Sequence, residues 1–232
     1  MANYCVCVVT GYLFTGHSPF TTATLARPWL PWTLVMGAGF IIAFNLMAWC
    51  AQKAGITTMA LANKLSLVIP VTIAILVFGE HAGTVKIMGL ALAVPAIWLI
   101  NRSQSDDTNG SLLWPALLFL VSGSLDTLVN YIQSTYLAAP EDQALCTIVC
   151  FATAGTIGIS IVTVLAITGK TKLAFRNLLA GVVLGIPNFF SIYFMVKALR
   201  SNLFQSSATI PLLNISILVA TALMAIIAFR EK

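Results

Sequence analysis

The amino-acid sequence predicts an all-α protein, a polytopic membrane bundle of transmembrane helices. Of its 232 residues, 59% are hydrophobic and 8% are charged, whereas soluble domains carry roughly 25% charged residues. The mean hydropathy is +0.96. Asp, Glu, Lys and Arg are absent from four long stretches, residues 28–52, 143–169, 177–196 and 201–229. Such runs cannot alternate between lipid and a wet lumen, as barrel strands do, so we expect them to cross the bilayer as helices.

Eight apolar segments follow one another along the chain. The first, 2–14, is shorter than the roughly 20 residues that a spanning helix needs. We expect spans at 31–52, 57–79, 85–100 (a short one), 112–137, 144–168, 178–198 and 205–229. The most polar segment, 101–110, predicts a linker between two halves of the chain. Because the loops are short, consecutive helices are expected to be antiparallel neighbours.

Prolines and small residues add detail to these spans. Prolines inside a span are expected to kink or break it, and small residues four positions apart allow two helix backbones to approach closely. The prolines are Pro70, Pro95, Pro187 and Pro211, and the small pairs are Ala154/Gly158, Gly181/Gly185 and Gly89/Ala93.

The chain also contains an internal repeat. A shift of 151 residues lays 58–80 over 209–231 and matches Asn63 with Asn214 and Glu80 with Glu231. Five expected crossings separate the two glutamates, so they lie on opposite membrane faces and the repeat is inverted. Inverted repeats are typical of secondary transporters, whose substrate sites lie near the midplane where the repeats meet.

The same offset predicts the domain organisation. A counterpart of the fifth span would precede Met1, and a counterpart of the fourth would follow Lys232. We therefore expect about eight helices of a 5 + 5 architecture. Residues 1–102 form a first repeat (helices 2–5), 103–110 a linker, and 111–232 a second repeat (helices 6–9), with helices 1 and 10 missing.

Two strings carry a resemblance to a known family. Residues 54–80 contain Ala-Gly-Ile-Thr, Leu-Val-Ile-Pro-Val and Phe-Gly-Glu, and residues 198–232 contain Ala-Leu-Arg-Ser and Phe-Arg-Glu-Lys. They resemble the drug/metabolite transporter superfamily, in particular its ten-helix EamA-type members. In that family the fourth helix of each repeat has a central proline and closes with Gly-Glu, which Pro70, Gly79 and Glu80 fit. In the second repeat Glu231 fits, whereas Arg230 and Thr221 depart from the pattern. The resemblance implies ATP-independent transport across the cytoplasmic (inner) membrane. Because members of the family are usually exporters, it also implies export.

Polar groups inside spans are the candidates for transport, because they are costly at mid-bilayer depth. Asp126 is an acid well inside its span, and Asn130 and Gln133 follow on the same helix face. Together they can bind an amine or relay a proton; alternatively, a neutral or Lys-paired Asp126 only holds helices together. Lys64 is a base inside a span, and it either extends to the interface or pairs with Asp126.

Amides at repeat-related positions are further candidates. Asn63 and Asn214 can frame a midplane cavity from both repeats, or merely join two helices by hydrogen bonds. Asn45, Asn188 and Tyr193 lie on the second and seventh spans, which the repeat makes counterparts.

Pro187 precedes Asn188 and has two readings. It either breaks the helix and frees backbone carbonyls for a ligand, or is only a packing kink.

These features favour a secondary active transporter of small organic metabolites, amino-acid-like or drug-like, working by alternating access. The alternative is a non-transporting membrane protein, such as a lipid-handling enzyme or an interaction subunit. No nucleotide-binding loop and no cluster with metal-ligand spacing occurs, so we expect no enzymatic activity, no metal and no cofactor. The net charge of +5 is attributed to loops near lipid headgroups and not to nucleic-acid binding. The expected partners are a small-molecule substrate, the lipid bilayer and a coupled proton, with the oligomeric state left open.

Overall fold

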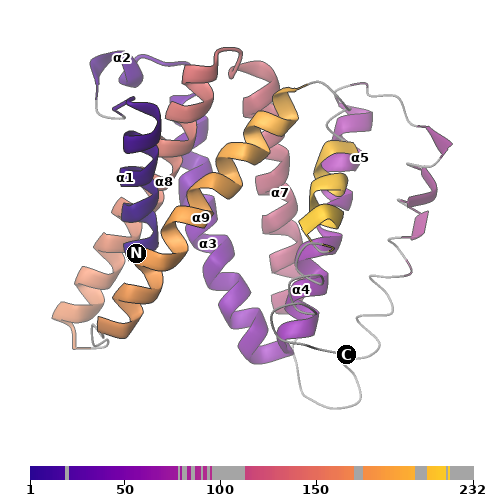
Figure 1. Cartoon of the computed structure of the whole chain (residues 1–232). Helices are drawn as coiled ribbons and strands as arrows, with labels where there is room; N and C mark the ends of the chain where they lie inside the picture. Colours follow the sequence, from indigo (N-terminus) through magenta and orange to yellow (C-terminus); the bar gives the residue numbers. More distant parts are fainter. Residues whose placement is uncertain are drawn as a thin grey trace. The chain divides into compact units, whose positions relative to one another are not determined.

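The computed structural model describes residues 1–18, 21–77, 113–169, 175–201 and 208–217, and also 79, 83, 84, 87–89, 91, 92, 95 and 219 (Figure 1). Throughout these residues the regular structure is α-helical, which confirms the predicted all-α fold. The expected linker at 103–110, most of the span at 85–100 and most of that at 205–229 lie outside the described residues.

Five of the described helical segments are long and apolar enough to cross a membrane, so the protein is a multi-pass membrane protein by helix length and composition. They are Leu30–Ala54 (α3), Ile56–Leu76 (α4, Ile56–Leu65, with α5, Val68–Leu76), Leu113–Thr135 (α7), Pro140–Ile167 (α8) and Leu178–Arg200 within α9 (Phe175–Arg200). The shorter helices are α1 (Ala2–Thr15), α2 (Thr22–Leu25) and Ala208–Ile217.

The start of α8 differs from the expectation. The span predicted from 144 begins at Pro140, so that Glu141 and Asp142 lie in the first helical turn and not in a loop. Proline suits this position because its missing N–H has no helical partner to lose, and acidic side chains interact favourably with the positive end of the helix dipole.

The prolines act differently from one helix to another. The span Ile56–Leu76 is kinked at Ser66 and Leu67, between α4 and α5, where both residues keep right-handed helical backbone angles; we call this kink the interruption. Pro70 explains the interruption, since its ring clashes with the carbonyl four residues earlier, that of Ser66. In contrast, α9 continues through Pro187, so the reading in which Pro187 breaks its helix is wrong. Pro211 lies in the first turn of Ala208–Ile217, where proline is tolerated.

The chain forms two compact units, each drawing on both halves of the sequence. Unit 1 comprises Met1–Leu46 and Leu128–Arg200, and unit 2 comprises Met47–Thr127 and Ser201–Lys232. The predicted repeats, 1–102 and 111–232, describe a relation within the sequence and stay a prediction.

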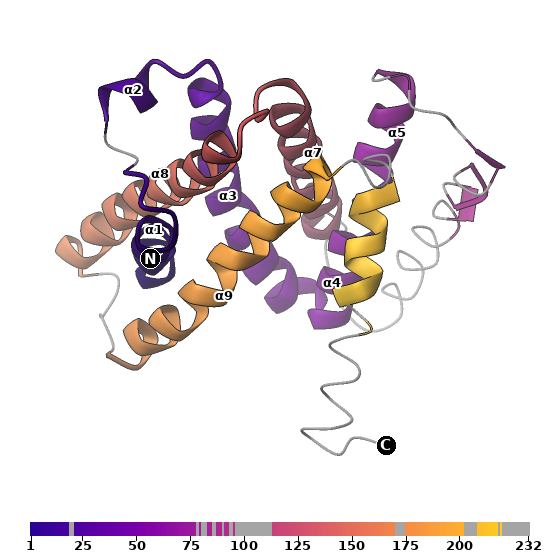
Figure 2. The same ribbon diagram turned by 45° about the horizontal axis from the view of Figure 1, so that its top comes forward.

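In unit 1, α1 lies against both α8 and α9 (Figures 1 and 2). Gly181 and Gly185 of α9 make this approach possible: a Cβ on Gly185 would lie 2.5 Å from the Cβ of Val6, and one on Gly181 would lie 2.9 Å from the Cβ of Ala2. This predicted small-residue pair is thus a helix contact. Of the pair Gly89/Ala93, Ala93 lies outside the described residues, and a Cβ on Gly89 would meet nothing within 4 Å.

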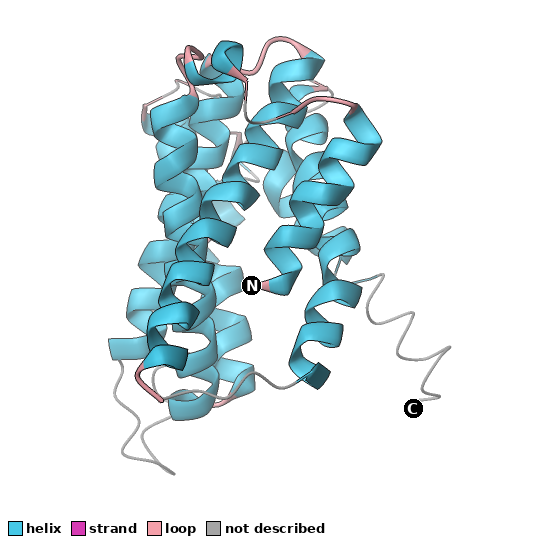
Figure 3. Ribbon diagram, turned by 90° about the vertical axis from the view of Figure 1, so that its left-hand side faces the viewer, coloured by secondary structure: helices cyan, strands magenta, loops and turns pink. Residues whose placement is uncertain are grey.

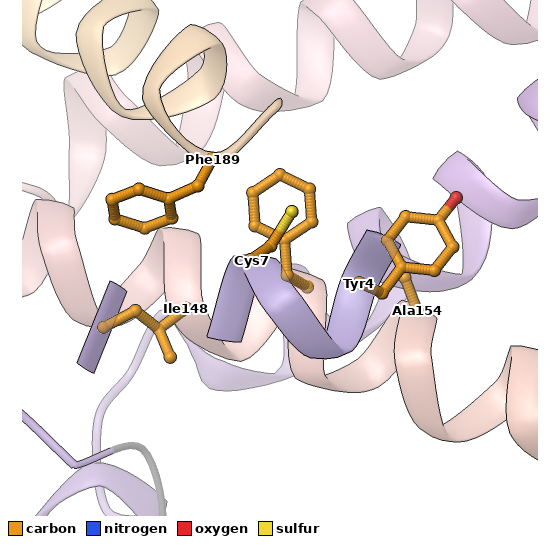
Figure 4. Close-up of a cluster of buried hydrophobic side chains, with 6 residues drawn as sticks. Tyr4, Cys7, Ile148, Ala154 and Phe189 are labelled. Atoms are coloured by element: carbon orange, nitrogen blue, oxygen red, sulfur yellow. The ribbon is translucent and has the colours of Figure 1, made fainter. Parts of the chain in front are cut away.

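The described residues form helices and loops, with no strand among them (Figure 3). The core of unit 1 is formed where α1, α8 and α9 meet, and Figure 4 shows its side chains. Its buried side chains are Tyr4, Cys7, Ile148, Phe151, Ala154 and Phe189. Ala154 is fully buried there, which agrees with its predicted role at a close helix contact.

Candidate functional site

The interrupted helix of unit 2 is the first element of the candidate site. At the interruption Ser66 is buried, and its hydroxyl donates a hydrogen bond to the backbone carbonyl of Asn63 at 2.6 Å. The backbone continues through a tight turn in which the Ile69 amide donates to the Ser66 carbonyl at 3.0 Å.

Lys64 stands in the last turn of α4, directly before the interruption. Its ammonium donates to Asn214 Oδ1 at 2.6 Å, and Asn214 Nδ2 donates to the Ile210 carbonyl at 3.1 Å. Lys64 is exposed, and an ammonium has three donors, so this contact leaves two for another acceptor. Asn214, which belongs to the predicted second repeat, is thus hydrogen-bonded to Lys64. Lys64 directly follows Asn63, the residue that the predicted repeat matches with Asn214.

Helix α7 approaches the interruption closely through Gly123. A Cβ at this position would lie 2.8 Å from the Ser66 carbonyl oxygen and 2.5 Å from Ile69 Cδ1. Asp126 follows one turn later and is half-buried, and Lys64 lies two residues before Ser66. Within the described part of the chain, the two side chains do not reach the 4.0 Å of a direct ion pair. Unit 2 therefore holds an acid and a base near an interrupted helix without pairing them directly.

A stripe of polar side chains runs along α7. Asp126, Asn130 and Gln133 share it as predicted, and Ser122 extends it by one turn; at 100° per residue the four lie within an arc of about 80°. Asn130 and Gln133 are buried, at 2% and 4% exposure.

Two atoms of this stripe stand out. Ser122 Oγ and Asn130 Oδ1 are the buried side-chain atoms, among the residues the structure describes, that have no hydrogen-bond partner. Ser122 belongs to unit 2 and Asn130 to unit 1. A buried oxygen without a partner is costly, so each is expected to meet water or a ligand.

Sequence reasoning missed Ser122, because serine inside a helix ordinarily bonds its own backbone one turn earlier. The signal that could have found it is its four-residue spacing from Asp126.

The remaining predicted residues belong to unit 1. Asn45 is exposed and donates to the Ile41 carbonyl of its own helix at 2.8 Å. Asn188 donates to Asn3 Oδ1 at 3.2 Å, and Cys7 Sγ also donates to that oxygen, at 3.3 Å. Asn188 therefore joins α9 to α1, whereas Asn45 bonds within α3.

Tyr193 takes part in an aromatic group on α9 and α1. Its ring stacks on Phe189 at 5.8 Å and meets Phe14 edge-on at 5.7 Å, and the Lys197 ammonium lies 6.0 Å from its centroid. These contacts make Tyr193 a packing residue of unit 1.

A second polar group of unit 1 was not foreseen. Asp142 accepts a hydrogen bond from the buried Trp29 indole at 3.2 Å and forms an ion pair with Arg27 at 3.3 Å. Next to it, the hydroxyl of Thr33 and the thiol of Cys146 are 3.1 Å apart. This group ties the segment before α3 to the first turn of α8.

Among the residues described, no three His, Cys, Asp or Glu side chains are placed to hold a metal ion. The five cysteines, all of which are described, are free thiols.

The chain is similar to an uncharacterized protein of Haemophilus influenzae. The two are 23% identical over 206 residues, which cover 87% of this chain and 68% of that protein. No protein-family model matches the chain. No solved structure matches it either.

Proposed function

We propose that the chain is a secondary active transporter of the drug/metabolite type, exporting small organic molecules, amino-acid-like or drug-like, by alternating access. One observation carries the proposal. A kinked spanning helix carries a lysine that donates a hydrogen bond to an amide from the other half of the sequence, Lys64 to Asn214 at 2.6 Å. A pump driven by ATP would need a nucleotide-binding loop, which the sequence lacks.

The predicted repeat supports a place for this contact near the middle of the membrane. Repeats of inverted topology are related by an axis that lies in the membrane plane, and residues close to the axis meet their own equivalents. Asn214 is the equivalent of Asn63, so the Lys64–Asn214 contact is one residue away from joining equivalent positions. A charged lysine is energetically unfavourable at this depth of the bilayer, and such residues commonly belong to substrate or ion pathways.

The stripe on α7 supplies groups for binding. Ser122 Oγ and Asn130 Oδ1 are buried without a partner in the described part of the chain, and Asp126 stands between them on the same face. Ligand sites in membrane bundles use few polar groups of this kind on otherwise apolar walls. In unit 2 we assign substrate contacts to Lys64, Asn214 and Asn63, and proton coupling to Asp126. A role for Asn130 and Gln133, which follow Asp126 on the same face of α7, stays a prediction from the sequence.

The experiment is an unbiased uptake assay. Sealed vesicles with and without the purified chain are incubated with a mixture of cell metabolites under a proton gradient, and their contents are compared by mass spectrometry. We expect at least one small molecule to accumulate only in vesicles that contain the chain.

The variants Asn214→Ala and Asn45→Ala form a matched pair. Both remove an amide that donates to its own helix, but only Asn214 also accepts from Lys64. Accumulation should fall severalfold with Asn214→Ala and be unchanged with Asn45→Ala. Identical contents of vesicles with and without the chain would contradict transport.

A further inference from the structure

The charged groups of unit 2 carry an inference about the substrate, which rests on the transport function proposed above. Within the described residues of this unit, the charged side chains are Lys53, Lys64 and Asp126, and the other titratable side chain is the Cys50 thiol. Lys53 lies in the last turn of α3, a helix end, and is exposed. In the described part of this unit, Lys64 and Asp126 are therefore the charged groups beside the interruption, one positive and one negative, and we call this pair the charge system.

This charge system is incompletely paired. Lys64 uses one of three donors on the neutral oxygen of Asn214. Asp126 follows Gly123, which packs against the Ser66 carbonyl two residues after Lys64, and it forms no direct ion pair with Lys64 in the described part of the chain. In an apolar environment an ammonium is stabilised by an anionic acceptor, because hydrogen bonds to a charged group are about twice as strong as those between neutral groups. A carboxylate entering the site would complete the coordination of Lys64.

A second negative charge would be opposed by Asp126. Two carboxylates sharing one ammonium at low dielectric leave the site with a net charge of −1, which is unfavourable. The site stays neutral if Asp126 takes up one proton when one monovalent anion binds. A dianion such as phosphate would leave a net negative charge even with Asp126 protonated. The charge balance of Lys64, Asp126 and the ligand therefore favours a monocarboxylate.

We propose that Lys64 binds the carboxylate of a small organic monoanion, and that Asp126 takes up one proton in the same step. The proton comes from the solution and forms an O–H bond on an Asp126 oxygen. The ligand carboxylate then accepts hydrogen bonds from the two remaining donors of Lys64. One anion and one proton occupy the site together, and both leave together.

The test measures binding to the purified full chain in lipid nanodiscs. The probes are a panel of monocarboxylates, each matched with its neutral amide and with the amine of the same carbon skeleton. We expect thermal stabilisation by carboxylates and not by their matched amides or amines. Calorimetry in two buffers of different ionisation enthalpy should report one proton taken up per anion bound.

The pH dependence separates the roles of the two residues. Between about pH 6 and 9 the probes stay ionised, and Kd should rise tenfold per pH unit once Asp126 is ionised in the free protein. Asp126→Asn should still bind the anion, with a Kd that no longer depends on pH and with no proton uptake. Lys64→Gln should lose binding, and Lys64→Arg should retain it because the charge is kept.

Several results would overturn the proposal. They are binding of the amines or amides instead, no binding by any carboxylate, anion binding without proton uptake, or anion binding unchanged in Lys64→Gln. If uptake into vesicles is seen while any of these holds, the transport function stands and the anion assignment falls. If no uptake is seen at all, the transport function itself fails.

Discussion

At the scale of single residues, Asp142 shows how one carboxylate can organise several neighbours. It lies in the first turn of α8 and meets two groups from the segment before α3, the Arg27 guanidinium and the Trp29 indole. Trp29 is 1% exposed, whereas 39% of the Arg27 side chain is exposed. The two contacts therefore contribute differently to stability, because without Asp142 the buried Trp29 N–H would have no water to donate to, whereas the exposed Arg27 would be solvated.

This difference gives a prediction for stability. Asp142→Ala should lower the free energy of unfolding by about 1–3 kcal/mol, because it leaves the buried Trp29 N–H without an acceptor. Arg27→Gln should cost less than about 1 kcal/mol, since exposed ion pairs are weak. Denaturant or thermal unfolding of the purified chain in detergent measures both. Asp142→Ala removes both contacts, so a loss for Arg27→Gln as large as that for Asp142→Ala would show that the ion pair, not the indole bond, dominates.

At the scale of elements, the sequence predicted the helices 31–52, 112–137 and 178–198 well, because long uncharged apolar runs have few alternatives in a bilayer. It also predicted that Pro70 disturbs its span. The start of α8 was missed because the pair Glu141 and Asp142 is typical of a loop. Only the contacts of Asp142 with Arg27 and Trp29, which are over a hundred positions away in the chain, explain its burial.

The candidate site was predictable to a similar degree. Helical periodicity was enough to place Asp126, Asn130 and Gln133 on one face of α7. Periodicity cannot say which helices lie side by side, so the Lys64–Asn214 bond and the approach of Gly123 to Ser66 required the structure. From the sequence, Asn45 and Asn188 look alike, since each is an amide inside an apolar span. In the structure Asn45 donates to the backbone of its own helix, whereas Asn188 donates to Asn3 of α1.

The contact between α1 and α9 leads to a prediction at the same scale. In Gly185→Ala the new Cβ would stand 2.5 Å from Val6 Cβ and 2.9 Å from the Asn3 carbonyl oxygen, so the helices must separate. We expect a loss of about 1–3 kcal/mol, as for other overpacked positions. Gly89→Ala is the matched control, since its Cβ would meet nothing within 4 Å. Equal unfolding temperatures for the two variants would contradict close packing at Gly185.

At the scale of the whole molecule, the proposed transport depends on the predicted inverted repeat and on the contact between Lys64 and Asn214. The C-terminal ends of α3 and α9 carry Lys53 and Lys197, which a shift of 144 residues aligns. An inverted repeat places these lysines on opposite faces of the membrane. Asn214, bonded to Lys64 in unit 2, is expected between the two faces and open to each in turn.

Labelling of single cysteines from each side of the membrane tests the predicted inverted repeat and the access to Asn214 from both sides. Single cysteines replace Lys53, Lys197 or Asn214 in a chain whose five native cysteines have been removed, and a membrane-impermeant thiol reagent is applied to sealed vesicles from one side or the other. The account predicts that Lys53→Cys and Lys197→Cys react from opposite sides. It predicts that Asn214→Cys reacts from both sides. Reaction of both lysine variants from the same side, or of Asn214→Cys from neither side, would contradict it.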